Sequence, residues 1–315
     1  MRYYPNPAEN LGLKALNDAI EEAFAEHGRG NVQMPPKDYV FFEKGDFRTM
    51  PGYIPSLGIA GVKVVNVHPD NRKEGLPTVM AVIVIIDPET GYPEAILNGT
   101  KLTDLRTAAA GAVAAKYLSP SGKVSLGVFG SGRQAQTQAA ATALELEVDE
   151  IRVWSRSDSH AESFCQLFPD HECRPAAPED VCGCDVIVTA TPSREPIVKN
   201  EWISEGTHIN AIGADAPGKE ELDPAILNRA TVIVDDPRQA VHSGEINVPI
   251  KKRAVQRGQN CRNTWRVCSW KKEESLEERD YGIRLNRPCD PGSRDIKDRD
   301  GECKVDQTRI RLKIT

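Results

Sequence analysis

Apolar positions follow a helical period at the beginning of the chain and a strand-like pattern soon after. Residues 11–27 carry apolar side chains three and four positions apart, which predicts an amphipathic helix. Segments 38–43, 61–67 and 78–87 are rich in β-branched residues and predict strands. Residues 103–118 are rich in alanine and predict a second helix. The first part of the chain is therefore expected to form a mixed α+β domain.

The pattern changes at residue 123, where short apolar segments begin to alternate with helical ones. The predicted strands are 124–129, 151–155, 185–190, 207–213 and 231–235. This alternation is typical of the doubly wound parallel sheet of a Rossmann fold. We therefore predict an α/β protein with a mixed domain over residues 1–118 and a Rossmann dinucleotide-binding domain over residues 119–250.

A glycine-rich turn follows the first strand of the second domain, with the spacing Gly130-x-Gly132-x-x-Ala135. Gly130 permits the tight turn, Gly132 lets a pyrophosphate approach the backbone, and Ala135 lets the next helix pack closely on the sheet. The strand before and the helix after the turn agree with this interpretation. The residues predicted to bind the dinucleotide here are Gly130, Ser131, Gly132, Arg133, Gln134 and Ala135.

The end of the second strand of this domain bears on the choice between NAD and NADP. NAD sites favour an acidic residue there, which binds the ribose hydroxyls. This chain has Ser155, Arg156 and Ser157 instead, with no acid before Asp158. An arginine between two serines suits a 2′-phosphate, which favours NADP or the use of both cofactors. The alternative is a solvated loop without a role in binding.

Three cations of the first domain are candidates for binding an anionic substrate. Arg48 lies in a Gly- and Pro-bounded segment, Lys63 lies within a predicted strand, and Arg106 lies near the start of the Ala-rich helix. A lysine in an apolar strand is costly unless it is paired. A small carboxylate substrate would supply the partner. Taken alone, each cation is better explained as a solvated surface charge, and Lys63 is the strongest candidate of the three.

Asp215 follows the predicted strand 207–213. Ligands of open parallel sheets lie beyond the carboxyl ends of the strands. A carboxylate at that position is able to take a proton from an amine or a water molecule. The alternative is that Asp215 caps a helix that begins near Pro217.

Composition limits the class of protein. The net charge of −6 argues against a general nucleic-acid binder. No apolar run is long enough for a membrane span, and the first residues lack the apolar stretch of a signal peptide, so a cytoplasmic protein is expected. The eight cysteines are then expected to be free thiols. Cys182 and Cys184 have no second pair of ligands at a suitable spacing, so no metal site is predicted.

Several stretches together resemble the ornithine cyclodeaminase/mu-crystallin family, and most closely its alanine-oxidising branch. The likeness covers about residues 11–250. The matching stretches are Met34–Lys37, Glu43–Pro51, Lys63, Asn66–Asn71, Gly75–Met80, Leu105–Gly111, the Gly130 turn, Thr191–Arg194, Asn210–Lys219 and Ser243–Val248.

The resemblance implies a homodimer whose first domain provides both the subunit contact and the substrate site. It implies that Arg48, Lys63 and Arg106 bind the carboxylate of a small amino-acid substrate. Catalysis is assigned by the same likeness to Asp215 and Lys63. The further residues implied to contact the cofactor, NAD or NADP, are Thr107, Thr191 and Pro192.

The implied activity is NAD(P)-dependent oxidative deamination of L-alanine to pyruvate and ammonia. One alternative within the family is the conversion of ornithine to proline and ammonia, in which the hydride returns to the ring. Another is a non-catalytic NADP-binding protein, or a ketimine reductase.

The likeness is expected to stop after Ile250. Residues 251–315 carry 18 Lys and Arg against 11 Asp and Glu, whereas the preceding residues carry 22 against 35. Residues 279–292 can be encoded so that deleting one nucleotide yields the family's strand and Ser-Thr-Gly turn. We therefore interpret residues 251–315 as an aberrant basic tail produced by a frameshift, with impaired catalysis as the consequence. The alternative is a genuine basic tail, although the segment lacks strand or helix periodicity.

Overall fold

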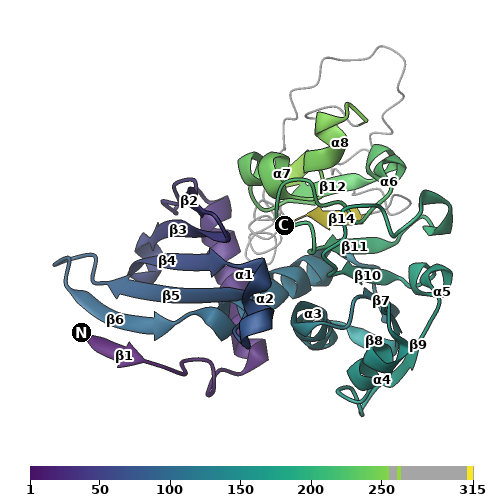
Figure 1. Cartoon of the computed structure of the whole chain (residues 1–315), viewed down its shortest axis with the longest axis horizontal. Coiled ribbons are helices and arrows are strands. Elements are labelled where there is room, and N and C mark those ends of the chain that lie inside the picture. Colours follow the sequence, from purple (N-terminus) through teal and green to yellow (C-terminus); the bar gives the residue numbers. More distant parts are fainter. Residues whose placement is uncertain (255–260, 264–310, 315) are drawn as a thin grey trace, which may run out of the picture.

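Two sheets, with helix α2 (Thr100–Leu118) between them, organise the protein (Figure 1). The computed structural model describes residues 1–254, 261–263 and 311–314. One sheet is mixed and the other is parallel, so the predicted α/β class, a Rossmann sheet joined to a mixed α+β domain, is confirmed. The division at residues 118 and 250 stays a prediction.

The first sheet has six strands in the order β1-β6-β5-β4-β3-β2. Their bounds are β1 Arg2–Tyr4, β2 Asp38–Phe42, β3 Gly45–Ile54, β4 Ile59–Val67, β5 Val79–Ile86 and β6 Pro93–Asn98. Helix α1 (Leu13–Gly28) and the predicted strands over β2, β4 and β5 are confirmed. Strand β3 was not predicted, because Pro51 and the glycines at its start and centre obscure its period. It nevertheless pairs along its length with β4.

Cross-strand pairing puts three polar residues on one face of this sheet. Tyr39 on β2 lies opposite Arg48 on β3, and Met50 on β3 lies opposite Lys63 on β4. Paired residues share a face, and so do Arg48 and Met50, which are two positions apart. Tyr39, Arg48 and Lys63 therefore lie on the same face of the sheet.

The second sheet is parallel, with strand order β13-β12-β14-β11-β10-β7-β8-β9. Its bounds are β7 Lys123–Phe129, β8 Glu147–Trp154, β9 Glu172–Pro175, β10 Val186–Thr189, β11 His208–Ala211, β12 Thr231–Val234, β13 Cys261–Asn263 and β14 Arg311–Ile314. The predicted strands over β7, β8, β10, β11 and β12 are confirmed. Chain order reverses between β7 and β10, which is where an open parallel sheet binds its ligand.

Short helices connect and flank these strands. They are α3 Arg133–Ala143, α4 Asp158–Cys165, α5 Pro178–Cys182, α6 Pro224–Arg229, α7 Pro237–Ser243 and α8 Asn247–Lys251, with 3₁₀ turns η1 Pro55–Leu57, η2 Pro69–Glu74 and η3 Asn200–Trp202. No helix within the described ranges has both the length and the apolar character that a membrane crossing requires.

Two strands of the parallel sheet come from the segment interpreted as an aberrant tail. Strand β14 pairs with both β11 and β12, and β13 pairs with β12. The expectation that residues 251–315 lack strands is therefore wrong for these two stretches. The proposed frame-shifted stretch 279–292 lies outside the described residues.

The cysteines depart in part from the prediction of free thiols. Cys165 at the end of α4 forms a disulfide with Cys173 on β9, with Cα atoms 5.2 Å apart, so the prediction is wrong for this pair. Cys182 and Cys184 are free and buried. Burial raises the pKa of Cys182 to about 12 and that of Cys184 to about 11, so both are neutral thiols. In the part of the chain that the structure describes, no cluster of side chains has the composition of a metal site.

Helix α2 packs closely on the second domain because its residues are small. Residues 108–115 are all buried, and all of them except Val113 are alanine or glycine. A Cβ built on Gly111 would come within 2.1 Å of Gln138 Oε1 on α3. The Gly111 carbonyl also accepts a hydrogen bond from Asn210 Nδ2 on β11 at 3.0 Å. Gly111 therefore sets the approach of α2 to the Rossmann domain.

Gly111→Ala is expected to lower the free energy of unfolding by about 1–3 kcal/mol, because overpacking displaces the buried Gln138 side chain. Alanine has the better helix propensity by about 1 kcal/mol, which opposes the effect without cancelling it. Chemical denaturation measures the change. Gly12→Ala is the control, since a Cβ there meets nothing within 4 Å. Equal stability of the two variants would contradict close packing at Gly111.

Candidate active site

The glycine-rich turn joins β7 to α3 with the geometry that a pyrophosphate needs. Gly130 has φ of 105° and a built Cβ would meet Ala190 O at 2.8 Å, so only glycine fits. Gly132 has an ordinary backbone with φ of −74°, and a Cβ there meets nothing within 4 Å. Open space therefore lies before the backbone where α3 begins, and the first N–H groups of α3 carry the helix's partial positive charge. The turn fits a dinucleotide.

The ends of β8 and β9 border a hollow of about 340 Å³ beside this turn, whose lining includes Trp154, Ser155 and Asp158. Ser155 Oγ lies 3.0 Å from Ser131 Oγ, which ties the hollow to the turn. Arg156 is exposed and has no ion-pair partner among the described residues. Its guanidinium is therefore accessible from solvent, and its contact with a 2′-phosphate stays a prediction. Ser157 Oγ lies 2.9 Å from Ser159 Oγ.

The start of α2 lies next to the start of α3. Asp104 Oδ1 accepts a hydrogen bond from Gln134 Nε2 at 2.9 Å, and Arg133 forms an ion pair with Asp104 at 3.4 Å. The Thr107 hydroxyl donates to Thr103 O at 2.7 Å, and Gln138 Nε2 donates to Thr107 O at 3.0 Å. Thr107 is thereby held near the glycine-rich turn.

The end of β10 contributes Thr191 and Pro192. A built Cβ on Gly130 would lie 3.4 Å from Thr191 Cγ2, so the two strand ends are adjacent. The backbone N–H and the hydroxyl of Thr191 both donate to Glu221 Oε1 at 2.7 Å. The structure therefore groups Gly130 and Thr191 at the point where the chain order of the sheet reverses.

The cations of the first domain interact with one another. Burial, followed by the nearby charges of Arg106, Lys37 and Arg48, lowers the pKa of Lys63 to about 6. Lys63 is thus largely a neutral amine at neutral pH in the absence of an anion. Arg106 is exposed to solvent although protein atoms crowd around it, and this desolvation lowers its pKa. These cations form a cluster that an anionic ligand would stabilise.

Arg48 connects this cluster to the second domain. Burial opposes its charge, yet the hydrogen bond and charge of Asp46, with smaller contributions from Tyr39 and Asp215, raise its pKa. Arg48 Nε lies 2.7 Å from Asp46 Oδ1. Asp215, in the loop after β11, is therefore among the negative charges near enough to Arg48 to favour its charged form.

Asp215 lies in the loop between β11 and α6. Its side chain is 53% exposed and forms an ion pair with Lys219. No helix begins at Pro217 in this described stretch, because the next helix, α6, begins at Pro224. The alternative of an N-cap is therefore wrong, and the carboxylate stays accessible to a ligand.

Two side chains of the cluster were not among the predicted site residues. Lys37 Nζ lies 5.6 Å from the centre of the Tyr39 ring, and the Arg48 guanidinium lies 5.2 Å from it. The Tyr39 hydroxyl is buried and has no hydrogen-bond partner within the described part of the chain. Lys37 could have been found from its place in the Met34–Lys37 stretch, whereas Tyr39 has no signal in the sequence apart from its strand position.

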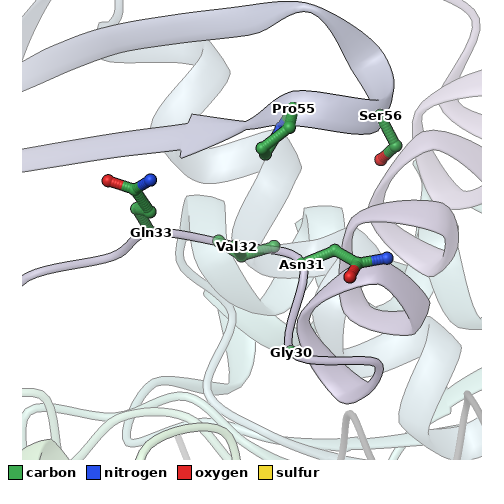
Figure 2. A pocket seen from close by; sticks show the side chains of 6 residues that line it. All are labelled: Gly30, Asn31, Val32, Gln33, Pro55 and Ser56. Carbon is green, nitrogen blue, oxygen red and sulfur yellow. The ribbon is translucent and has the colours of Figure 1, made fainter.

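A separate hollow of about 320 Å³ lies at the end of α1. Figure 2 shows its lining, with Asn31 and Ser56 on opposite sides. Ser56 Oγ donates to Glu26 Oε2 at 2.5 Å and Asn31 Nδ2 donates to the same oxygen at 3.0 Å. None of the predicted site residues lines this hollow.

Comparison with known proteins identifies the family. The model of the "Ornithine cyclodeaminase/mu-crystallin family" matches residues 6–280, which extends beyond the expected end of the likeness at Ile250. "Alanine dehydrogenase" of Archaeoglobus fulgidus is 48% identical over 249 residues, covering 78% of this chain and 76% of that protein.

Solved structures agree with this assignment. An archaeal alanine dehydrogenase dimer with bound NAD superposes with a TM-score of 0.83 and 38% identity, over 96% of this chain and 86% of that one. Thermococcus litoralis Δ1-pyrroline-2-carboxylate reductase, in complex with NADH and L-proline, gives a TM-score of 0.84 at 26% identity, over 99% and 91% of the two chains. The chain therefore belongs to the ornithine cyclodeaminase/mu-crystallin family of NAD-binding enzymes.

Proposed function

We propose that this protein catalyses the reversible, NAD(P)-dependent oxidative deamination of L-alanine to pyruvate and ammonia. The observation that carries the choice of alanine is the 48% identity to an alanine dehydrogenase over three quarters of both chains. The cation cluster that faces Asp215 supports an amino acid as the substrate, because it offers positive charge to a carboxylate and a carboxylate base to the reacting carbon.

Arg48, Lys63 and Arg106 are proposed to bind the substrate carboxylate. The buried Tyr39 hydroxyl, which has no protein partner among the described residues, supplies a further donor. Because the pKa of Lys63 is about 6, the arrival of a carboxylate favours uptake of a proton by this amine. Lys63 is thereby able to exchange a proton within the site, which is its proposed catalytic role.

Asp215 is proposed as the acid/base residue. NAD(P), when bound beside this site, would supply the acceptor for the hydride that leaves the α-carbon of alanine. Asp215 then takes a proton from a water molecule, whose oxygen attacks the resulting imine carbon, and returns it to the amine as the C–N bond breaks. Its half-exposed position permits entry of that water.

The residues around the Gly130 turn are proposed to hold the cofactor. Gly132 and the start of α3 receive the pyrophosphate, Thr107, Thr191 and Pro192 border it, and the hollow beside Ser155 receives the adenosine. Solved relatives bind NAD or NADH. Arg156 supports use of NADP as well, since its guanidinium is exposed.

A homodimer is proposed as the assembly. One solved relative is a dimer. On the face of the first sheet opposite Lys63, the paired residues Val64 and Val82 and the paired residues Val62 and Val84 are only partly buried. An apolar sheet face of this kind is a suitable subunit contact. The proposed location is the cytoplasm; the free thiols of Cys182 and Cys184 agree with it, whereas the Cys165–Cys173 disulfide does not.

We further propose that residues 251–315 are the product of a shifted reading frame and that catalysis by this chain is weak. The reversal of charge after Ile250 supports the proposal. Two findings argue against the proposal: the family match extends to residue 280, and β14 pairs with β11. Sequencing of the coding region for residues 240–300 decides it. A shift that restores the Ser-Thr-Gly turn is expected, and an unbroken frame would refute the proposal.

The function is tested by following alanine-dependent formation of NADH and NADPH, with this chain and with any frame-restored chain. Alanine is expected to reduce the cofactor, and Asp215→Asn is expected to lower kcat by about 10²-fold or more, because the base is lost. Conversion of ornithine to proline without net cofactor change would indicate the cyclodeaminase instead. Cofactor binding without turnover, unaffected by Asp215→Asn, would indicate a non-catalytic binder.

Gly132→Ala is expected to weaken cofactor binding by about tenfold or more, because the new methyl group occupies the space through which the pyrophosphate approaches. The melting temperature is expected to stay unchanged, since that methyl group meets no protein atom within 4 Å. Titration of NADH fluorescence measures the affinity. Gly12→Ala serves as the control. Equal affinity for NADH in both variants would show that the Gly130 turn does not bind the cofactor.

Lys63→Met is expected to stabilise the fold by about 1–4 kcal/mol at neutral pH while it abolishes substrate binding, because an apolar side chain replaces a desolvated amine. The pKa of Lys63 falls from 10.5 to about 6 in the folded protein, so unfolding takes up a proton between these values. Stability of the wild-type protein therefore rises with pH across this window.

Calorimetry at several pH values measures this trade-off. The advantage of Lys63→Met is expected to shrink as the pH rises from 7 toward 10. Lys123→Met, at a side chain that is 64% exposed, is the control and is expected to change little. A lower melting temperature for Lys63→Met at neutral pH would show that Lys63 is not held at an energetic cost.

A further inference from the structure

The stretch Ser243–Val248, which the sequence singled out and the proposed chemistry does not use, lies against the loop that carries Asp215. Glu245 is fully buried, and its Oε1 accepts hydrogen bonds from the backbone N–H groups of Glu221 at 2.8 Å and Leu222 at 2.7 Å. Both donors belong to the end of the loop 212–223 that follows β11. Glu245 therefore fixes the backbone at that end of the loop.

Asn247 fixes the middle of the same loop. Its Oδ1 accepts the N–H of Gly218 at 3.0 Å, and its Nδ2 donates to Lys219 O at 3.1 Å and to Gly244 O at 2.7 Å. Asn247 is fully buried. Gly218 has φ of 80°, a conformation that glycine adopts readily and that turns the chain back toward Asp215.

Glu221 extends the restraint to the beginning of the loop. Its Oε2 accepts from the Gly213 N–H and from Thr189 Oγ1, both at 2.8 Å, and its Oε1 accepts from the N–H and hydroxyl of Thr191, both at 2.7 Å. One buried carboxylate thus joins the end of β10 to the end of β11. Asp215 lies between two fixed points, Gly213 and Gly218.

The same stretch is continuous with a contact to the substrate side. His242 is the residue before Ser243, and its ring centre lies 5.8 Å from that of Tyr39. Tyr39 is the cross-strand partner of Arg48. A single short segment therefore touches both the sheet that carries the cations and the loop that carries Asp215.

We propose that Glu245 and Asn247 are positioning residues, which act through Glu221 and Gly218 to hold the Asp215 loop at a fixed place opposite the cation cluster. The role of Asp215 itself rests on the function proposed above. Glu245 contacts only the loop backbone among its hydrogen-bond partners in the described chain, so its contribution is geometric.

The protonation of the buried carboxyl groups separates this role from acid/base catalysis. Burial, and then the neighbouring Glu221, raises the pKa of Glu245 well above its ordinary value, which favours its neutral form. Its Oε1 accepts both backbone N–H groups, and its Oε2 has no hydrogen-bond partner among the described residues. An amide has the shape of a neutral carboxyl group and keeps the acceptor oxygen. Glu245→Gln is therefore expected to behave like the wild-type protein.

Glu221→Gln is the matched contrast. The same atoms change, but both oxygens of Glu221 accept backbone N–H groups, whereas only one oxygen of Glu245 does. Burial raises the pKa of Glu221 as well, so the contrast rests on geometry: each oxygen of Glu221 faces one backbone N–H, that of Gly213 or that of Thr191. Either orientation of an amide directs its NH₂ group at one of these donors and leaves that N–H unsatisfied. Glu221→Gln is therefore expected to loosen the loop although the side-chain volume is unchanged.

Hydrogen exchange of the full-length protein, followed by mass spectrometry, tests the positioning directly. Asn247→Ala and Glu221→Gln are expected to speed exchange in the peptide that spans residues 213–222 by about tenfold or more, and Glu245→Gln to leave it unchanged. The peptide that spans α3 is the internal reference. Unchanged exchange in Asn247→Ala, or equal acceleration in Glu245→Gln and Glu221→Gln, would overturn the proposal.

Kinetics separates a positioning role from general destabilisation. Asn247→Ala is expected to lower kcat for alanine by about 10²-fold, while the dissociation constant of NADH changes by less than about twofold, because the Gly130 turn is untouched. Parallel loss of both would overturn the proposal. Should Asn247→Ala not fold, the isosteric pair at Glu221 and Glu245 decides. Should neither this chain nor a frame-restored chain oxidise alanine, the proposed function fails, and hydrogen exchange still decides the positioning.

Discussion

The close contact of helix α2 with the second domain is the constraint on which the rest of the site depends. Its alanine and glycine residues let α2 approach α3 and β11 so closely that a methyl group at Gly111 would displace the Gln138 side chain. The beginning of the same helix carries Arg106 and Thr107. Because one rigid helix is buried against the second domain and also packs on β5, the cations of the first sheet keep a defined position relative to the glycine-rich turn.

That constraint explains how the protein tolerates an unfavourable arrangement of charge. Lys63 lies among Lys37, Arg48 and Arg106, and its pKa near 6 records the cost of desolvation and repulsion. A flexible pair of domains would separate and let water solvate these groups. The hydrogen bonds from Asn210 to Gly111 and from Gln138 to Thr107, both 3.0 Å long, oppose that separation. The cations therefore keep their arrangement before any carboxylate binds. Their mutual repulsion is offset by packing and hydrogen bonds elsewhere in the fold.

Much of this architecture was predictable from the sequence, since it follows from local patterns. The strands of the parallel sheet, the Gly130 turn and the isolated Lys63 each have a signal within a few residues. Strand β3 was missed because its pairing with β2 and β4 overrides a weak local preference. The contact of Lys37 and Arg48 with Tyr39, and the bonds of Glu245 and Asn247 to the Asp215 loop, depend on residues brought together by the fold. The Cys165–Cys173 pair was missed because composition indicates a reducing compartment but does not reveal proximity.

Three carboxyl groups around one loop differ in burial, and this difference gives the same functional group different properties. Asp215 is half exposed and forms an ion pair only with Lys219 among the described residues, so its carboxylate is accessible to a ligand. Glu221 is fully buried and surrounded by four donors, which makes it an anchor rather than a base. Glu245 is fully buried beside Glu221, so its pKa rises, and its Oε1 accepts two backbone N–H groups. A fully buried carboxyl group gains hydrogen bonds at the expense of access, and the group that we propose as the acid/base residue is the one that the fold leaves least enclosed.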